Sequence, residues 1–413
     1  METAMYIRRN LRAAFEEAGA FFPALLVTGA RQVGKSTFLR KIAEPERGFV
    51  SLDPLDQRLQ AREDPRLFLA NNPAPVIIDE IQYAPELLSY IKLAIDEARF
   101  REPQKSRGMY WLTGSQQFAV MKGVSESLAG RIGIFNMHGL SAAEMDGRDS
   151  GPFLPEQEFN AELPQPSPLD MFRRIWLGSF PELHVAEHPE KYWQRFYQSY
   201  VQTYLSRDVR ALTQVADENR FYSFLRAVAA RTGQMLNYSS LARDSDISQP
   251  TAKSWLSILA ASGLVRLLYP HLKNRNRQMI STPKLYMLDC GLAAYLCAWN
   301  SPEALMNGAA AGHFFETWCF TEILKSYCNA GISADLSYYR DKDEREIDLI
   351  IQQNGILYPI EFKKAGTPKT KDVKAFERLE IFQQPQGMGA LVSLCPDLRR
   401  LQENVRCNPA WQL

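Results

Sequence analysis

Gly29-Ala30-Arg31-Gln32-Val33-Gly34-Lys35-Ser36 is the stretch that decides the fold of the first part of this chain. It follows the apolar run Leu25–Thr28 and leads into a helical stretch, Thr37–Ile42. In a strand–loop–helix context, glycines let backbone N–H groups and the helix N-terminus point at phosphate oxygens. We therefore predict a P-loop that binds ATP. The residues expected to bind it are Gly29, Ala30, Arg31, Gln32, Val33, Gly34, Lys35, Ser36 and Thr37.

Three side chains at the end of this loop have distinct predicted roles. Lys35 reaches the β and γ phosphates, the Ser36 hydroxyl is a ligand for Mg²⁺, and Thr37 contacts the α phosphate. The cofactors expected from this motif are therefore ATP and Mg²⁺.

A second motif supports the nucleotide site. The apolar strand 75–78 ends in two carboxylates, Asp79 and Glu80. Asp79 is predicted to hold Mg²⁺, and Glu80 to polarise the attacking water as the catalytic base. A buried strand ending in a solvated acidic turn is the alternative, but the P-loop upstream favours the catalytic interpretation.

Two further residues are catalytic candidates. The strand 109–113 leads into Ser115 and Gln116, either of which can sense the γ phosphate if this strand lies beside the P-loop strand; Ser115 is preferred. Arg131, after the turn at Gly130, is a candidate arginine finger for the ATP of a neighbouring subunit. The alternatives are an ordinary turn for Ser115 and a surface ion pair for Arg131.

Length and composition set limits on the rest of the chain. The 413 residues predict several domains, and 46% apolar residues suffice for packed cores. We expect a P-loop domain over 1–150, a Pro- and Gly-rich linker over 151–168, a helical region over 169–300 and an α/β region over 301–413. The net charge of +1 means that a nucleic-acid partner must be held by a local patch.

The same sequence argues against a membrane or secreted protein. The longest early apolar run, Phe21–Val27, is interrupted by Pro23 and is far too short to span a bilayer. The six cysteines include no CxxC pair, which favours reduced structural thiols. We expect a cytoplasmic protein that does not bind membranes.

A helix-turn-helix pattern occupies residues 236–272. One helix begins near Asn237, a turn follows at 246–250, and a second helix covers 251–259; Gly263 then ends it before a strand at 264–268. Five basic residues and no acidic ones lie between 266 and 288, namely Arg266, Lys273, Arg275, Arg277 and Lys284. A winged helix that contacts DNA is the prediction, and a protein-packing module with a solvated basic loop is the alternative. The aromatic and arginine-rich helix around 192–208 is interpreted as packing between domains.

The stretches 26–37, 51–53, 76–82, 85–88 and 128–131 together resemble the AAA-type ATPase module of many bacterial and archaeal chains. Such ATPases usually carry a C-terminal DUF4143 domain, and Gly178-Ser179-Phe180-Pro181-Glu182 resembles the start of that second part. The resemblance covers nearly the whole chain. It implies an AAA+ type parallel sheet and a homo-oligomer, for which a hexamer is natural if Arg131 acts in trans.

The C-terminal region resembles the PD-(D/E)xK restriction-endonuclease fold, which the DUF4143 part is thought to share. Asp348 begins one predicted strand, Glu361 and Lys363 end the next, and Glu316 lies on the preceding helix. Residues i and i+2 of a strand project to the same side, so Glu361 and Lys363 lie together. Asp348 and Glu361 are predicted to hold Mg²⁺, with Glu316 and Lys363 assisting. Retention of this fold without cleavage is the alternative.

Three functions remain open from the sequence. The first is an ATP-hydrolysing motor or switch that acts on DNA, either duplex or branched such as a Holliday junction. The second is an Mg²⁺-dependent nuclease gated by ATP. The third is a signalling or scaffold ATPase that acts on a protein partner.

Overall fold

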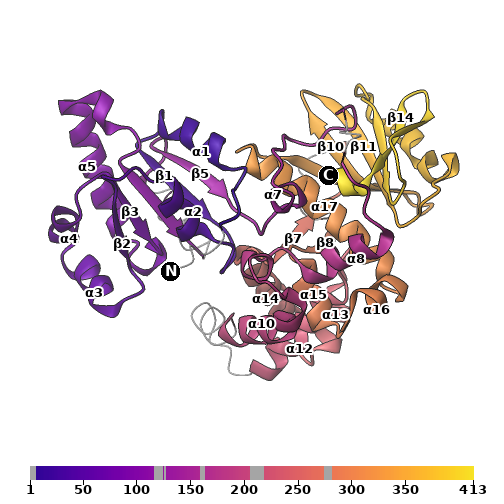
Figure 1. Ribbon diagram of the computed structural model, residues 1–413, viewed down its shortest axis with the longest axis horizontal. Coiled ribbons are helices and arrows are strands. Elements are labelled where there is room, and N and C mark those ends of the chain that lie inside the picture. Colours follow the sequence, from indigo (N-terminus) through magenta and orange to yellow (C-terminus); the bar gives the residue numbers. More distant parts are fainter. Residues whose placement is uncertain (1–5, 116–123, 125–126, 159–162, 205–217, 274–280) are drawn as a thin grey trace.

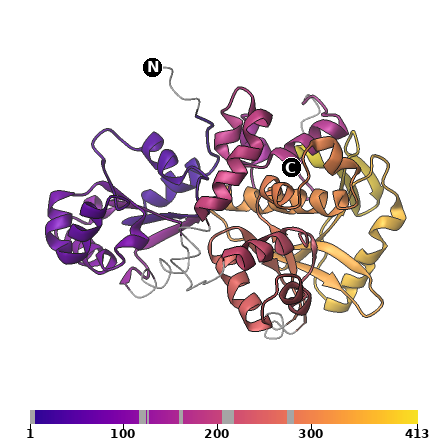
Figure 2. The ribbon, with the colours of Figure 1, turned by 90° about the horizontal axis from the view of Figure 1, so that it is seen from below.

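The computed structural model describes residues 6–115, 124, 127–158, 163–204, 218–273 and 281–413. Figure 1 shows an N-terminal region on one side and the middle and C-terminal regions packed together on the other, and Figure 2 shows the same division from below. The N-terminal region extends to Met145, the middle region runs from Pro168 to Asn307, and the C-terminal region begins at Ala311.

A parallel sheet of five strands forms the centre of the N-terminal region, in the order β2-β3-β4-β1-β5. Every residue of β1 is buried, as expected for a central parallel strand covered on both faces. β4 lies between β1 and β3, so the carboxyl ends of all three strands meet at one edge. The strands are β1 (Ala24–Thr28), β2 (Gly48–Ser51), β3 (Val76–Asp79), β4 (Tyr110–Gly114) and β5 (Ile132–Asn136).

The helices of this region surround the sheet, except the last one, α7, which lies beside the C-terminal region (Figure 1). The second helix, α2, begins at Lys35 within the P-loop. The helices are α1 (Arg12–Gly19), α2 (Lys35–Ile42), α3 (Leu55–Glu63), α4 (Pro65–Asn71), α5 (Leu87–Arg101) and α7 (Ala142–Met145), with 3-10 helices η1 (Ile81–Tyr83) and η2 (Pro103–Ser106). The strands expected at 25–28, 75–78 and 109–113 are present within a residue or so of their expected ends, and the α/β fold is confirmed. The edge strand β5 was not predicted; its residues alternate between buried and more exposed, as an edge strand allows.

The middle region is mainly helical, with a small antiparallel sheet in the order β6-β8-β7. Its helices are α8 (Pro168–Leu177), α9 (Pro181–His184), α10 (Pro189–Tyr204), α12 (Glu218–Ala229), α13 (Tyr238–Asp244), α14 (Gln249–Ala261), α15 (Cys290–Leu296) and α16 (Pro302–Asn307). Its strands are β6 (Gln234–Met235), β7 (Val265–Leu268) and β8 (Lys284–Met287).

The predicted helix–turn–helix elements are all present in this region. The Asn237 side chain accepts a hydrogen bond at the start of α13, and Ser248 does the same for α14. Gly263, with φ +71°, ends the second helix as expected and redirects the chain into β7. α10 buries Trp193, Tyr197, Tyr200, Val201 and Tyr204, which agrees with its interpretation as a packing helix.

The C-terminal region packs α17 (Ala311–Asn329) against a six-stranded mixed sheet in the order β13-β14-β12-β11-β10-β9. The strands are β9 (Asp335–Arg340), β10 (Glu346–Gln353), β11 (Ile356–Lys363), β12 (Gly389–Ser393), β13 (Arg399–Gln402) and β14 (Val405–Pro409). Two 3-10 helices complete this region, η5 (Thr370–Phe382) and the short η6 (Ala410–Gln412).

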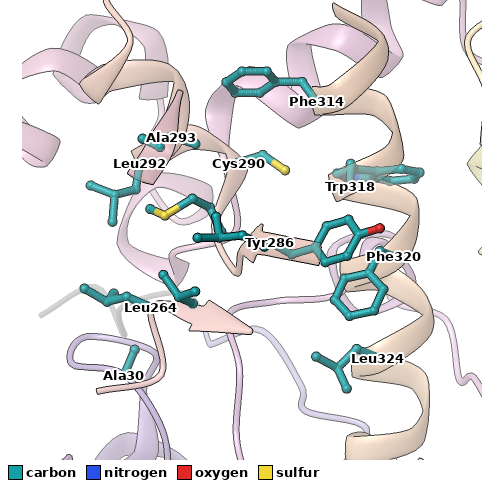
Figure 3. Packing of buried hydrophobic residues seen from close by; sticks show 14 of the residues in the cluster. Ala30, Leu264, Tyr286, Cys290, Leu292, Ala293, Phe314, Trp318, Phe320 and Leu324 are labelled. Carbon is teal, nitrogen blue, oxygen red and sulfur yellow. The ribbon is translucent and has the colours of Figure 1, made fainter. Parts of the chain in front are cut away.

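The helix α17 is almost entirely buried because all three regions pack around it. The buried pair Glu322 and Lys325 joins it to the N-terminal region: Glu322 accepts from the Ala142 N–H at 2.7 Å, and Lys325 donates to the Leu140 carbonyl at 2.9 Å. On its other side, Phe320 stacks on Tyr286 of β8 with ring centroids 4.0 Å apart (Figure 3). The core is therefore continuous between the regions.

No helix in the described part of the chain is long and apolar enough to cross a membrane. All six cysteines lie within that part, and each is a free thiol.

Candidate nucleotide site and carboxylate cluster

The P-loop connects β1 to α2 and is held in place by backbone contacts. A Cβ on Gly29 would lie 2.0 Å from the Met137 carbonyl oxygen, so only glycine fits there. Gly34, with φ +91°, precedes the first turn of α2. The buried Arg9 guanidinium donates to the Val33 carbonyl at 2.9 Å and pairs with Glu144 at 3.1 Å. The loop is thus fixed before any ligand binds.

Lys35 lies at the centre of this loop. Its buried ammonium donates to the carbonyls of Gly29 and Ala30, at 3.0 and 2.8 Å. Because these are weak neutral acceptors, a phosphate group in the loop would offer the ammonium stronger, charged ones.

Asp79 joins three elements of the site through one carboxylate. Its Oδ1 accepts from the Ser36 hydroxyl at 2.5 Å and from the Thr113 hydroxyl at 2.7 Å, and its Oδ2 accepts from Ser51 at 3.3 Å. A hydroxyl and a carboxylate oxygen in direct contact are the donor types that Mg²⁺ prefers. The residues present therefore fit the predicted magnesium site.

Glu80 follows β3 in a left-handed conformation, with φ +59°. Its backbone N–H donates to the Thr113 hydroxyl at 2.9 Å, and its carboxylate accepts from the Ser115 hydroxyl at 3.1 Å and from the Gln82 amide. These bonds hold the carboxylate beside the P-loop cavity. Ser115 therefore contacts the predicted base, while Gln116 lies outside the described residues.

Two cavities adjoin the P-loop. One, of about 420 Å³, is lined by Arg31, Gln32, Gly34, Lys35, Ser36, Thr37 and Glu80, and on its far side by three α10 residues: Tyr200, Thr203 and Tyr204. The other, of about 760 Å³, has mostly apolar walls that include Ile7, Val33, Leu140, Pro181 and Phe196. A cavity lined on one side by polar P-loop residues, beside a mostly apolar cavity, suits a ligand with a phosphate chain and an aromatic base.

Arg131 lies away from these cavities. It precedes β5 at the amino end of the sheet, where its carbonyl accepts from the Ala24 N–H, whereas the P-loop is at the carboxyl end. Its guanidinium forms a two-point ion pair with Asp96 of α5, at 2.8 and 3.1 Å. Arg131 therefore does not contact the nucleotide site of its own chain.

The C-terminal region brings its four predicted site residues together. Asp348 and Glu361 lie on neighbouring antiparallel strands, one step beyond the paired residues Leu349 and Ile360. Lys363 Nζ is 3.4 Å from Glu361 Oε1, as their i, i+2 spacing predicts. Glu316 on α17 completes the cluster, and burial together with the neighbouring Asp348 carboxylate raises the pKa of Glu316 to about 7.

Lys284 of β8 fills the centre of this carboxylate cluster. Its ammonium, only 3% exposed, lies 2.8 Å from Glu316, 2.5 Å from Glu346 and 3.0 Å from Asp348. Burial opposes its charge, but the carboxylates, Asp348 foremost, raise the pKa of Lys284 well above its usual value. Within the described residues, no set of three or more His, Cys, Asp or Glu side chains is arranged to hold a metal ion.

This position of Lys284 corrects one sequence interpretation. Lys284 was counted among the basic residues available for DNA phosphates, but its charge is buried against carboxylates of another region. Arg266 and Lys273 are exposed, and Arg275 and Arg277 lie outside the described residues.

Models of three protein families match the chain in succession. The model described as an AAA domain matches residues 22–146, a domain of unknown function, DUF8612, matches 169–303, and another, DUF4143, matches 311–413. The chain is an AAA-type P-loop ATPase with a C-terminal DUF4143 domain.

Relatives of this ATPase include two uncharacterized proteins, Mb2031c of Mycobacterium bovis and Rv2008c of Mycobacterium tuberculosis. Each is 28% identical over 369 residues, which cover 87% of this chain and 75% of the relative. Among solved structures, the Walker-type ATPase PABY2304 of Pyrococcus abyssi is 17% identical with a TM-score of 0.43, and covers 70% of this chain and 94% of its own. The protein VC1899 of Vibrio cholerae is 14% identical with a TM-score of 0.16, and covers 92% and 90%.

Sequence reasoning missed several residues that line or support the two candidate sites. Thr113 is the last residue before Gly114 in β4, and a polar side chain at that strand end was a usable signal. The α10 residues and Lys284 gave no such signal, because each lies far in sequence from the residues it faces. Only tertiary packing brings them to their sites.

We predict that Glu80→Gln retains ATP binding but lowers hydrolysis about 10²-fold or more, because an amide cannot act as a base. Lys35→Ala should abolish hydrolysis. Binding of a fluorescent ATP analogue and phosphate release measure the two steps separately. Hydrolysis at the normal rate by Glu80→Gln would refute the assignment of the base.

We predict that Lys284→Met lowers the free energy of unfolding by about 3–5 kcal/mol, because it leaves buried carboxylates without their cation. Lys342→Met is the matched control, since Lys342 is exposed and should change stability by less than about 0.5 kcal/mol. Urea unfolding of both variants is the measurement. Equal stability of the two variants would show that the Lys284 ion pairs contribute nothing.

Proposed function

We propose that this ATPase couples hydrolysis to DNA, either duplex or branched, and that DNA binds to the exposed face of α14. The polar side chains of Gln249, Lys253, Ser254 and Ser257 are exposed along one face of this helix. The opposite face buries Ala252, Trp255, Leu256, Ile258 and Leu259. A second helix with an uncovered polar face, directly after a short helix and a turn, supports a major-groove contact.

Few basic residues in the described part of the chain are exposed around α14. DNA would therefore be held there by a small number of individual contacts and not by a strongly basic surface. Lys253 is exposed on the helix itself, and Arg243 is exposed at the end of α13. The nearby acidic residues Asp244 and Asp246 pair with Arg231 and Arg220. Because these carboxylates are neutralised within the protein, they repel phosphates less than free carboxylates would.

The chemistry proposed for the nucleotide site uses ATP and Mg²⁺. Lys35 would leave the loop carbonyls for the β and γ phosphates, and Ser36 and Asp79 would hold Mg²⁺. That ion would neutralise charge on the β and γ oxygens during transfer. Glu80, oriented by Ser115 and Gln82, would position and polarise the attacking water.

We also propose that the protein works as a homo-oligomer, with a ring of six as the natural form. Arg131 lies at the end of the sheet opposite its own P-loop, so a finger role requires the ATP of a neighbouring subunit. In the isolated chain, the bidentate pair with Asp96 would fix the position of the guanidinium until a neighbouring subunit binds.

An ATP-gated nuclease is the second candidate. It is supported by the meeting of Glu316, Asp348, Glu361 and Lys363, which are the residue types that Mg²⁺-dependent cleavage uses. Lys284 argues against it, because its ammonium holds the Asp348 carboxylate that a metal would need. Cleavage of DNA by the full-length protein with Mg²⁺, lost in Asp348→Ala, would establish this function.

We predict that one DNA form, among duplex, single strand and four-way junction, raises the ATPase rate. Lys253→Glu should weaken the apparent DNA affinity roughly tenfold, because it reverses a charge on the contact helix. Lys342→Glu carries the same charge change at an exposed site elsewhere and should keep the response. Basal hydrolysis unaffected by every DNA would instead favour the switch that acts on a protein partner.

For Arg131 we predict that mixing Arg131→Ala subunits with wild type lowers the ATPase rate more than in proportion to their share. The reason is that each altered subunit would disable the site of its neighbour. The mixing series is measured at constant total protein, with Lys342→Ala as the control. A strictly proportional loss would contradict action in trans.

A further inference from the structure

The turn between α14 and β7 contacts both walls of the phosphate cavity. One wall is the P-loop and the other is the last turn of α10, which supplies Tyr200, Thr203 and Tyr204. These walls belong to different regions of the chain, yet they meet adjacent residues of this turn: the P-loop meets Gly263 and α10 meets Ser262.

The first contact is with the P-loop backbone. A Cβ on Gly263 would lie 3.1 Å from the backbone N of Ala30, so the two main chains are in close contact. Leu264 and Ala30 belong to the same buried cluster, and Figure 3 shows them next to each other. A shift of the P-loop therefore meets the end of α14 directly, because no flexible side chain lies between them.

The second contact is a buried hydrogen bond from the other wall. The Tyr204 hydroxyl donates to Ser262 Oγ at 3.2 Å, and both residues are buried. Ser262 is the C-cap of α14, with its N–H bonded to Ile258 and Ala260 carbonyls. Because an unpaired buried hydroxyl is costly, α10 and the end of α14 tend to move together.

We propose that α10 forms the second wall of the ATP site and that the Tyr204–Ser262 bond transmits nucleotide occupancy to α14. Phosphate oxygens bound between Lys35 and the Thr203 hydroxyl would draw the two walls together, while the Tyr204 hydroxyl keeps its hydrogen bond to Ser262. Both walls then order the same turn, so ATP stabilises the C-terminal half of α14. This coupling rests on the proposed use of the P-loop cavity for ATP but needs no DNA.

Hydrogen exchange of α14 amides tests the coupling, with the full-length Glu80→Gln protein as the parent because it should bind ATP without turnover. ATP with Mg²⁺ should slow exchange in peptides that cover residues 252–262. Ser262→Ala on this parent should keep ATP affinity within about twofold, because Ser262 does not line the cavity, and should lose at least half of the slowing.

Ser257→Ala is the matched control, because Ser257 lies on the exposed face of the same helix and bonds only to the Ser254 carbonyl. It should keep the full response. Tyr204→Phe removes the donor of the Tyr204–Ser262 hydrogen bond. At saturating ATP, this variant should also lose the ATP-dependent slowing of hydrogen exchange in α14.

The outcomes separate the coupling from the proposed function. No slowing in a parent that binds ATP, or full slowing in Ser262→Ala, would overturn the coupling and leave the ATP site intact. Failure of the parent to bind ATP would instead remove the nucleotide site on which it rests. Neither result depends on whether DNA stimulates hydrolysis.

Discussion

The P-loop is held between two backbone segments that are in close contact with it. On one side the Met137 carbonyl, after β5, presses on Gly29. On the other side the glycine turn after α14 presses on Ala30. Close packing of this kind transmits displacements, because protein interiors have few voids to absorb them. The nucleotide site and the middle region are therefore parts of one packed unit.

The buried carboxylates of the two sites are stabilised in different ways. Asp79 is surrounded by hydroxyls from three elements, which satisfy its oxygens without neutralising its charge. Asp348 and its neighbours hold a buried ammonium from another region. The first arrangement leaves the Asp79 charge for a cation to bind, whereas in the second an ammonium already lies against Asp348. This contrast favours the P-loop site over the C-terminal cluster as the centre of the chemistry.

The helix α17 links these sites within the fold. It carries Glu316 toward the carboxylate cluster and the Glu322–Lys325 pair toward the loop after β5. Phe320, between them, packs on the strand that supplies Lys284. The helix α17 belongs to the DUF4143 domain. Its Glu322–Lys325 pair therefore joins that domain to the ATPase domain through buried hydrogen bonds as well as apolar packing.

The sequence alone determined the local chemistry. Glycines at fixed spacing after a buried strand specified the P-loop, and Asp79 and Glu80 at the end of a second strand specified the acidic partner, because both patterns are local. The i, i+2 spacing likewise placed Glu361 beside Lys363. What only the tertiary structure decided was which distant segments complete each site: α10 opposite the P-loop, Lys284 among the C-terminal carboxylates, and Arg131 at the far end of the sheet. These positions depend on how the regions pack, and no short-range pattern encodes the packing of residues that lie far apart in the chain.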